Sequence, residues 1–367
     1  MTGKGTLHPQ VRVHSLYHST TRRRIGLIIA LAVLLFFSAL IAAGIGTVAI
    51  PPGDTVLAIL HALAPTVFPA PSGPQTSLIV LDFRLPRILL AVLTGICLAV
   101  AGTVMQGLLR NPLVSPFTLG LSSAAAFGAA VAIVIGPAIL IPFWAFGDNA
   151  FIIICAFFSG WLSMMLVYSI SRLRGTTQAT LILAGVVIGY IFSAGVLALK
   201  YLTNNEKLRE LVVWLMGGMW GATWNAVLLL IPITLICFVL LEWKAWDLNA
   251  LVAGDDIAKN VGIDVNRLRL LGLLASTFAA SACLAFTGII GFIGLMAPHI
   301  CRMIIGGDYR YLIPCSALMG ALILLVSDTV ARTIMSPVEI PVGIIMYVVG
   351  GFFFLFLILR ARGKGLF

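Results

Sequence analysis

The sequence predicts an all-α integral membrane protein with about ten transmembrane helices. Of its 367 residues, 60% are hydrophobic and only 10% are charged, whereas a soluble domain carries about 25% charged residues. Apolar runs of about 20 residues, the length that crosses a bilayer, recur along nearly the whole chain. A water-facing surface cannot be built from this composition, so the chain is predicted to face lipid.

The candidate spans follow one another closely and together predict a single transmembrane domain over 25–367. They lie near 25–45, 86–109, 117–141, 150–171, 179–202, 225–243, 268–287, 289–305, 312–331 and 341–360. The two spans that flank Gly288 are the hardest to separate. Small residues inside the spans, including Gly95, Gly102 and Gly294, favour close helix packing in lipid.

Residues 1–24 precede the first span and are polar and basic. They are predicted to form a flexible cytoplasmic tail. The span that follows is long, and no small-x-small cleavage site leads into a soluble mature domain, so it is not interpreted as a cleaved signal.

The distribution of cations predicts that both termini lie in the cytoplasm. With the N-terminus inside, the outside links hold six of the 23 Lys and Arg residues, namely Arg84, Arg87, Lys200, Lys207, Arg209 and Arg332. The other 17 fall in inside links, as the positive-inside rule requires. The net charge of +10 is therefore attributed to membrane topology and lipid headgroups, and no nucleic acid partner is expected.

Several common chemistries lack their motifs in this sequence. The six cysteines form no CxxC pair, so they are interpreted as buried hydrophobes and not as metal ligands. No G-x-x-x-x-G-K-[ST] loop is present, so the chain does not bind ATP in that way. Asp328 is the clearest ionisable group inside a span and is expected to pair with Arg332. An ion-coupled carrier usually needs buried carboxylates, so their scarcity argues against one.

The longest inside link, 244–269, reads KAWDLNALVAGDDIAKNVGIDVNRLR. Asp255 is predicted to cap a short helix and Asp264 to cap the next span, because Asp is favoured at helix starts. Gly254 and Gly262 are predicted to end two short helices. The link is either a connector on the membrane surface or an element that docks into the groove of a cytoplasmic partner.

Three of the outside cations are arginines that stand beside the predicted spans. Arg84 and Arg87 lie three residues apart in LDFRLPR, and Arg332 lies in SDTVARTIMSP. Long cationic side chains can extend to lipid headgroups. Alternatively, these arginines bind carboxylates of an external partner, since Arg forms bidentate pairs with them.

Several ordered segments resemble the FecCD-type permeases of bacterial ABC importers for ferric siderophores, haem and cobalamin. The matching runs, from about residue 84 to 360, are RLPR, LAVAGTVMQGLLRNPLVSPFTLG, LAGVVIGYIFSA, WLMGGMWGATW, LNALVAGDDIAKNVGI, GIIGFIGLMAPHICRMIIGGDYRYLIP and SDTVARTIMSPVEIPVGII. The resemblance implies a type II ABC importer permease fold in a bacterial cytoplasmic (inner) membrane. It implies a non-catalytic subunit for an iron chelate, with haem or cobalamin as alternative cargoes. A secondary transporter is the rival hypothesis.

The resemblance also implies partners. These are a cytoplasmic ABC ATPase dimer that uses ATP and Mg, a periplasmic or extracellular substrate-binding protein, and a second permease, as in a homodimer. The chain itself would bind no cofactor. In this family, outer arginines receive acidic side chains of the binding protein, and the positions that match here are Arg84, Arg87 and Arg332.

The resemblance further implies two sets of residues on the inner side and along the path. The ATPase-coupling positions are Gly254, Asp255, Asp256, Ile257, Ala258, Val261 and Gly262. The candidates near the translocation cavity are Met216, Gly217 and Gly218, and those for a cytoplasmic gate are Thr176, Thr177 and Gln178.

Overall fold

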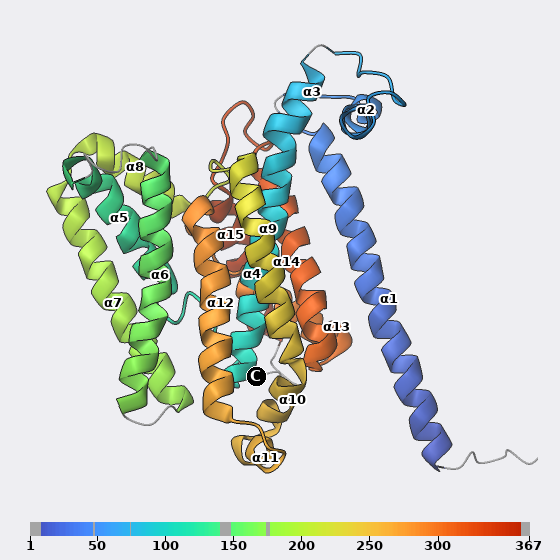
Figure 1. Cartoon of the computed structure of the whole chain (residues 1–367), viewed down its shortest axis with the longest axis vertical. Coiled ribbons are helices and arrows are strands. Elements are labelled where there is room, and N and C mark those ends of the chain that lie inside the picture. The colour runs from blue at the N-terminus through green and yellow to red at the C-terminus, as the bar shows by residue number, and fades with distance from the viewer. Residues whose placement is uncertain (1–8, 47, 74, 140–147, 174–176, 361–367) are drawn as a thin grey trace, which may run out of the picture.

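The computed structural model describes residues 9–46, 48–73, 75–139, 148–173 and 177–360, and within these ranges every regular element is a helix. The helices form one bundle, most of them running along a common direction (Figure 1). In chain order they are α1 (Pro9–Gly44), α2 (Pro52–Leu63), α3 (Thr76–Leu78), the π-helical η1 (Ile79–Arg84), α4 (Leu85–Leu108), α5 (Leu121–Ile139), α6 (Asp148–Leu173), α7 (Gln178–Leu202), α8 (Asn205–Met216), α9 (Trp224–Trp243), α10 (Ala245–Ala253), α11 (Asp255–Asn260), α12 (Val265–Thr287), α13 (Ile293–Ile305), α14 (Tyr309–Ala331) and α15 (Val342–Arg360).

Eight helical segments in the described ranges are long and apolar enough to cross a membrane, and the predicted fold class is confirmed. They are α1, the continuous α3–η1–α4 segment, α6, α7, α9, α12, α14 and α15. The other two predicted spans correspond to the shorter apolar helices α5 and α13. The 13 residues of α13 reach only about 20 Å at 1.5 Å per residue. The chain breaks before α13 because Gly288 and Phe292 both have a φ of +67°.

The helix α4 lies at the centre of the bundle, packed against α9, α12, α13 and α14, and most of its residues are buried. Glycines allow this close approach. A Cβ added at Gly95 would lie 2.5 Å from the carbonyl oxygen of Gly320, and one added at Gly102 would lie 1.9 Å from that of Gly294. The prediction that small residues bring helices together is therefore confirmed at these positions.

Replacing Gly102 with Ala is expected to destabilise the protein by about 1–3 kcal/mol, because the added methyl group meets backbone that cannot move aside. Gly351→Ala in α15 is the matched control, since nothing lies within 4 Å of its added Cβ. That control should be neutral or gain up to about 1 kcal/mol from helix propensity. Thermal unfolding midpoints of the detergent-purified variants measure both effects. Equal midpoints for the two variants would refute the packing argument.

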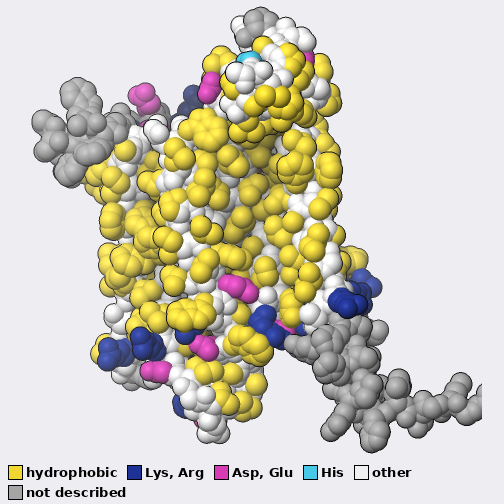
Figure 2. Space-filling view, turned by 45° about the vertical axis from the view of Figure 1, so that its right-hand side comes forward, with side chains coloured by type: hydrophobic (Ala, Val, Ile, Leu, Met, Phe, Trp, Pro, Cys, Tyr) yellow, Lys and Arg dark blue, Asp and Glu magenta, His cyan; other side chains and the backbone are white. Residues whose placement is uncertain are grey.

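The two ends of the bundle are distinct. α10, α11 and the start of α1 lie at one end, and α2 and α3 lie at the other (Figure 1). We call these the α11 end and the α2 end. Figure 2 shows an apolar belt between them, with Lys and Arg side chains gathered mainly toward the α11 end of this face. Arg84, at the end of η1, and Asp255, in α11, thus lie at opposite ends of the molecule.

The first helix begins well before the first predicted span. α1 starts at Pro9, so most of the segment predicted as a flexible tail continues the helix. Arg24 fixes this part of α1 to the bundle, because its Nε donates to the carbonyl oxygen of Ile305 at 2.9 Å and its Nη1 lies 3.5 Å from an oxygen of Asp308. The helix is otherwise peripheral and contacts mainly α14.

Candidate functional site

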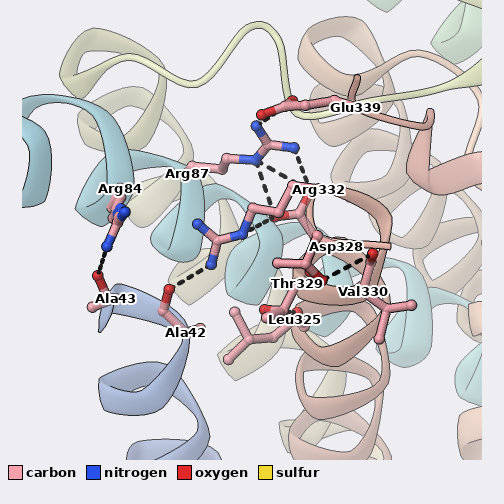
Figure 3. Close-up of polar contacts among 11 residues, drawn as sticks. Ala42, Ala43, Arg84, Arg87, Leu325, Asp328, Thr329, Val330, Arg332 and Glu339 are labelled. Atoms are coloured by element: carbon pink, nitrogen blue, oxygen red, sulfur yellow. Dashed lines mark hydrogen bonds and ion pairs between the residues drawn. The ribbon is translucent and has the colours of Figure 1, made fainter. Parts of the chain in front are cut away.

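Five charged side chains meet at the α2 end of the bundle (Figure 3). We call Arg84, Arg87, Asp328, Arg332 and Glu339 the outer cluster. Arg84 ends η1 and Arg87 lies in the first turn of α4. Asp328 lies in the last turn of α14, Arg332 directly follows that helix, and Glu339 lies in the connection to α15. The fold therefore brings together the three arginines that stood out in the sequence.

Asp328 is completely buried, and Arg87 is its main partner. The Nε of Arg87 donates to Oδ2 at 3.0 Å and Nη2 donates to Oδ1 at 2.9 Å, while Nη1 donates to Glu339 Oε2 at 2.7 Å. The Nε of Arg332 lies 4.0 Å from Asp328. The expected pair of Asp328 with Arg332 is therefore present but long, and the sequence did not point to Arg87, whose bidentate guanidinium takes both carboxylate oxygens at shorter distances.

Arg84 and Arg332 instead point at the C-terminal end of α1 (Figure 3). Nη1 of Arg84 donates to the carbonyl oxygen of Ala43 at 2.6 Å, and Nη2 of Arg332 donates to that of Ala42 at 2.5 Å. The last carbonyl groups of a helix lack partners within the helix and carry partial negative charge. The two guanidinium groups satisfy these carbonyls and hold α1 on the bundle.

This inward orientation leaves Arg84 and Arg332 only 6% and 4% exposed. Burial lowers the pKa of Arg332 from its ordinary value, against the opposing effect of the Asp328 carboxylate. In this structure neither guanidinium is presented to an external carboxylate. Sequence reasoning missed the capping role because the carbonyl groups of α1 lie about 40 residues or more away along the chain, and no side-chain motif marks them.

A pocket of about 390 Å³ lies beside the outer cluster. Its lining includes Phe83, Arg84, Arg87, Trp220, Arg332 and Glu339. The lining carries three guanidinium groups and one carboxylate, that of Glu339. Asp328 is not part of the lining, because it is buried and paired with Arg87. The pocket can therefore attract anionic or carboxylate groups, and its aromatic walls supply apolar contact.

The three residues proposed near a translocation cavity lie at the end of α8, where Met216 is the last residue of the helix and Gly217 and Gly218 follow it. Gly217 has a φ of +68°, and its carbonyl oxygen accepts from the N–H of Gly343 at 3.2 Å. The N–H of Gly218 donates to the carbonyl oxygen of Thr287 at 2.7 Å. The two glycines hold this turn against α12 and α15, and the side chain of Met216 is partly exposed.

The link between α9 and α12 folds into the two short helices that the sequence predicted. Gly254 and Gly262, with φ of +145° and +86°, follow α10 and α11. Asp264 caps α12, since its Oδ1 accepts from the N–H of Arg267 at 3.0 Å. The prediction that Asp255 caps α11 was wrong, because no side-chain cap is formed there.

Asp255 instead pairs with two arginines from other elements. Its Oδ1 lies 3.0 Å from Arg110 Nη2, and its Oδ2 accepts from Arg269 Nη2 at 2.9 Å. The Arg269 side chain is only 4% exposed. A buried guanidinium needs a nearby carboxylate, and this need outweighs a local cap.

The outward face of α11 carries a mixed set of side chains. Asp256 is 96% exposed at its side chain, and Ile257 and Val261 are also exposed. Ala258 faces inward and is completely buried. A short helix with exposed apolar and acidic residues at the tip of the molecule is suited to insertion into a groove of a partner.

The proposed gate falls at the start of α7. Thr176 lies outside the described residues, whereas Thr177 and Gln178 are described. Thr177 caps α7, because its Oγ1 accepts from the N–H of Thr180 at 3.2 Å. The hydroxyl groups of Thr180 and Ser171, the latter in α6, are 2.9 Å apart. The start of α7 is thus fixed to the end of α6.

The cysteines are all free, and every one except Cys155 is buried, in line with their interpretation as small hydrophobes. Across the part of the chain that the structure describes, no group of three or more His, Cys, Asp or Glu side chains is placed to hold a metal ion.

Comparison with known proteins places this arrangement in a family. Residues 31–360 match the model of the FecCD transport family. The chain belongs to the FecCD transport family. Its relatives include the haemin transport system permease of Yersinia pestis, which is 42% identical over 77% of this chain and 83% of the relative. The ferric citrate import permease of Bacillus subtilis is 37% identical over 90% and 94% of the two chains. The vitamin B12 import permease of Klebsiella pneumoniae is 34% identical over 96% and 98%.

A solved structure has the same fold. It is described as an inward-facing conformation of a metal-chelate type ABC transporter, and it superposes with a TM-score of 0.79. The two sequences are 32% identical, and the match covers 91% of this chain and 99% of the other. The fold of this chain is therefore that of an ABC importer permease.

Proposed function

We propose that this chain is the transmembrane permease subunit of an ABC importer that moves an iron chelate, such as a ferric siderophore, across the bacterial cytoplasmic membrane. The observation that carries the proposal is the family match over 31–360. The relatives named for ferric citrate, haemin and vitamin B12 all handle a chelated metal. Haem and cobalamin are therefore the alternative cargoes.

We assign ATP hydrolysis to a separate cytoplasmic ATPase dimer, which would bind ATP and Mg. The chain has no phosphate-binding G-x-x-x-x-G-K-[ST] loop. The exposed face of α11, with Asp256, Ile257 and Val261, supplies a surface that fits a groove on such a partner. In this proposal α10 and α11 transmit the movement of the ATPase to the bundle.

We further propose that a substrate-binding protein docks at the α2 end and that two permease copies form a homodimer around the cargo path. The positive pocket beside the outer cluster supports docking of an acidic partner. Arg87 and Glu339 keep partial exposure there. Because Arg84 and Arg332 face α1, their part in docking is to shape this surface and contribute its positive potential.

The rival hypothesis, a secondary transporter, receives little support from the charged groups. A carboxylate that couples transport to an ion gradient must bind and release that ion in each cycle. Asp328 is completely buried and held by a bidentate Arg87. This ion pair stabilises the structure and leaves no free oxygen for such a cycle.

Purification and transport together test the proposed function. The chain is purified in mild detergent from its host, and the co-purifying proteins are identified. The complex is then reconstituted into proteoliposomes and supplied in turn with iron(III) citrate, a ferric hydroxamate, haemin and cyanocobalamin. We expect an ABC ATPase to co-purify and one iron chelate to enter only with ATP. Uptake driven by a proton gradient without ATP would refute the proposal.

Reversing the charge of Asp256 is expected to weaken binding of the ATPase by at least about tenfold, because the reversed charge opposes the complementary surface of the partner. Asp256 is almost fully exposed, so the fold should not change. Asp82→Lys is the matched control, since Asp82 is an exposed aspartate at the opposite end of the bundle. Binding of the ATPase to detergent-purified permease is measured by surface plasmon resonance. Equal affinities for D256K and D82K would show that α11 is only a connector.

A further inference from the structure

Arg110 occupies an unusual position just after α4. Its φ is +43°, in the left-handed region that non-glycine residues seldom adopt. Such backbone strain persists only where surrounding contacts hold it, and it concentrates at functional positions. The side chain is about one-third exposed. The guanidinium of Arg110 is therefore held at the α11 end of the bundle and is partly exposed to solvent.

The guanidinium of Arg110 bridges two elements that are far apart in the sequence. Its Nη2 lies 3.0 Å from Oδ1 of Asp255, the first residue of α11. The side-chain amide of Gln178, the first residue of α7, also lies against this guanidinium. In the amide orientation that pairs its oxygen with donors, this oxygen accepts from Nη2 at 2.9 Å and from Nε at 2.5 Å. A planar guanidinium with several donors can hold both acceptors at once.

Arg269, the second partner of Asp255, has a structural role that differs from that of Arg110. Arg269 of α12 is buried and pairs with both carboxylate oxygens, so it anchors α11 to the bundle. Arg110 is far more exposed than Arg269, at 35% against 4% of the side chain. The Arg110 contact is the one that water can more readily replace, and its loss leaves Asp255 still paired.

The α7 end of the bridge is a rigid attachment point. Gln178 follows the Thr177 cap, and Thr180 in the same turn contacts Ser171 of α6. Further along, α7 lies against the backbone of the 115–120 turn. A Cβ added at Gly185 would lie 2.8 Å from Cα of Leu119. A displacement applied at Gln178 therefore acts on the whole helix and not on a loose side chain.

We infer that Arg110 is a positioning residue that ties α7 to the coupling helix α11, so that movement of α11 alters the position of α7. This inference rests on the proposed function, in which an ATPase moves α11. It assigns to the Asp255–Arg110–Gln178 bridge the step from the ATPase-facing surface to a membrane-spanning helix. The contacts with these two elements in turn help to hold Arg110 in its left-handed backbone conformation.

Packing offers a competing route between the same helices. Leu181 of α7 belongs to the same buried apolar cluster as Leu251 of α10 and Ala258 of α11. If this apolar contact alone transmitted the movement, removal of the guanidinium would leave the response of α7 intact. The two routes therefore make opposite predictions for an Arg110 variant.

Site-specific labelling in the full importer complex tests the inference. A cysteine is introduced at Thr177 or at Ile257, both exposed, and its reaction rate with a water-soluble maleimide is measured without nucleotide and after trapping with ATP and vanadate. The chain without an added cysteine gives the background rate. In the otherwise unaltered protein we expect the rate at both positions to change at least about fivefold between the two states.

In the Arg110→Gln variant, the rate at position 257 should still change, while the change at position 177 should fall below about twofold. Gln178→Ala, which removes only the other end of the bridge, should give the same loss. The double variant should lose no more than either single variant, since both act through one contact. Arg267→Gln is the matched control, because Arg267 is an exposed arginine at the same end.

The outcomes separate the inference from the proposed function. A full response at position 177 in R110Q and Q178A would overturn the bridge and favour the apolar route. Absence of any ATP response at both positions in the unaltered complex would instead refute ATP-driven coupling itself. Thermal midpoints are recorded for each variant, and Q178A decides the question if R110Q does not fold.

Discussion

Replacing Asp255 with Ala is expected to destabilise the protein by about 3–5 kcal/mol, because it removes the carboxylate that balances a buried guanidinium. Arg269 is 4% exposed at its side chain and directs Nη2 at both oxygens of Asp255. Its Nε contact to the carbonyl oxygen of Leu108 is long, at 3.4 Å. The thermal midpoint of the detergent-purified variant measures the loss.

Two further variants isolate the cause of this loss. Asp256→Ala changes the neighbouring aspartate, which is almost fully exposed, and should leave the midpoint nearly unchanged. Combining Asp255→Ala with Arg269→Met should recover much of the stability, because the double variant no longer buries a guanidinium without its carboxylate. If D255A and D256A unfold at the same temperature, the ion pair between Asp255 and Arg269 does not contribute to the stability of the protein.

This result also decides how the coupling surface can be studied. Charge reversal at both aspartates of α11 would change the folding of the chain and the binding of a partner at the same time, because Asp255 holds Arg269. Only Asp256 points outward. The docking test therefore uses Asp256 alone, and a loss of ATPase binding in that variant reports the surface itself.

Replacing Asp328 with Ala is the second large effect, also about 3–5 kcal/mol, because the outer cluster would lose its completely buried carboxylate. Arg87 would lose its three hydrogen bonds to Asp328, and Arg332 would lose the nearby carboxylate on α14. Repulsion among the arginines would then act in a site of low exposure. Unfolding midpoints in detergent with increasing denaturant measure the change.

Glu339→Gln is the matched control for this prediction. Glu339 also binds Arg87, at 2.7 Å, but its side chain is one-third exposed, so its removal should cost at most about 1 kcal/mol. The tryptophan fluorescence of the chain gives a second readout, because Trp220 lines the pocket beside the cluster. Similar midpoints for D328A and E339Q would contradict the central role of the buried carboxylate.

Much of the fold follows from local pattern. Apolar runs predict the helices because each buried backbone group must bond within its own segment. The cation bias between links predicts that the chain begins and ends on one side. Gly254, Gly262 and Asp264 punctuate the short helices as expected, because positive φ and helix capping depend on a residue and its immediate neighbours.

The ends of the first and eighth predicted spans show where the hydropathy pattern is not sufficient to predict the ends of a helix. α1 extends back to Pro9 through polar residues, and Arg24 holds this extension through contacts with residues about 280 positions away. α13 is shortened by the turn at 288–292. Both outcomes depend on packing against other helices, which a window of hydropathy does not contain.

The sequence by itself determined the membrane class, the all-helical fold and the residue types at both ends of the bundle, because these depend on local composition. Only the tertiary structure decided which charges pair. In the folded chain, Arg84 and Arg332 donate hydrogen bonds to the last carbonyl groups of α1. Asp328 forms its ion pair with Arg87, and Asp255 forms ion pairs with both Arg110 and Arg269. The physical reason is burial, since a guanidinium removed from water must take the nearest acceptor in space, wherever that acceptor lies along the chain.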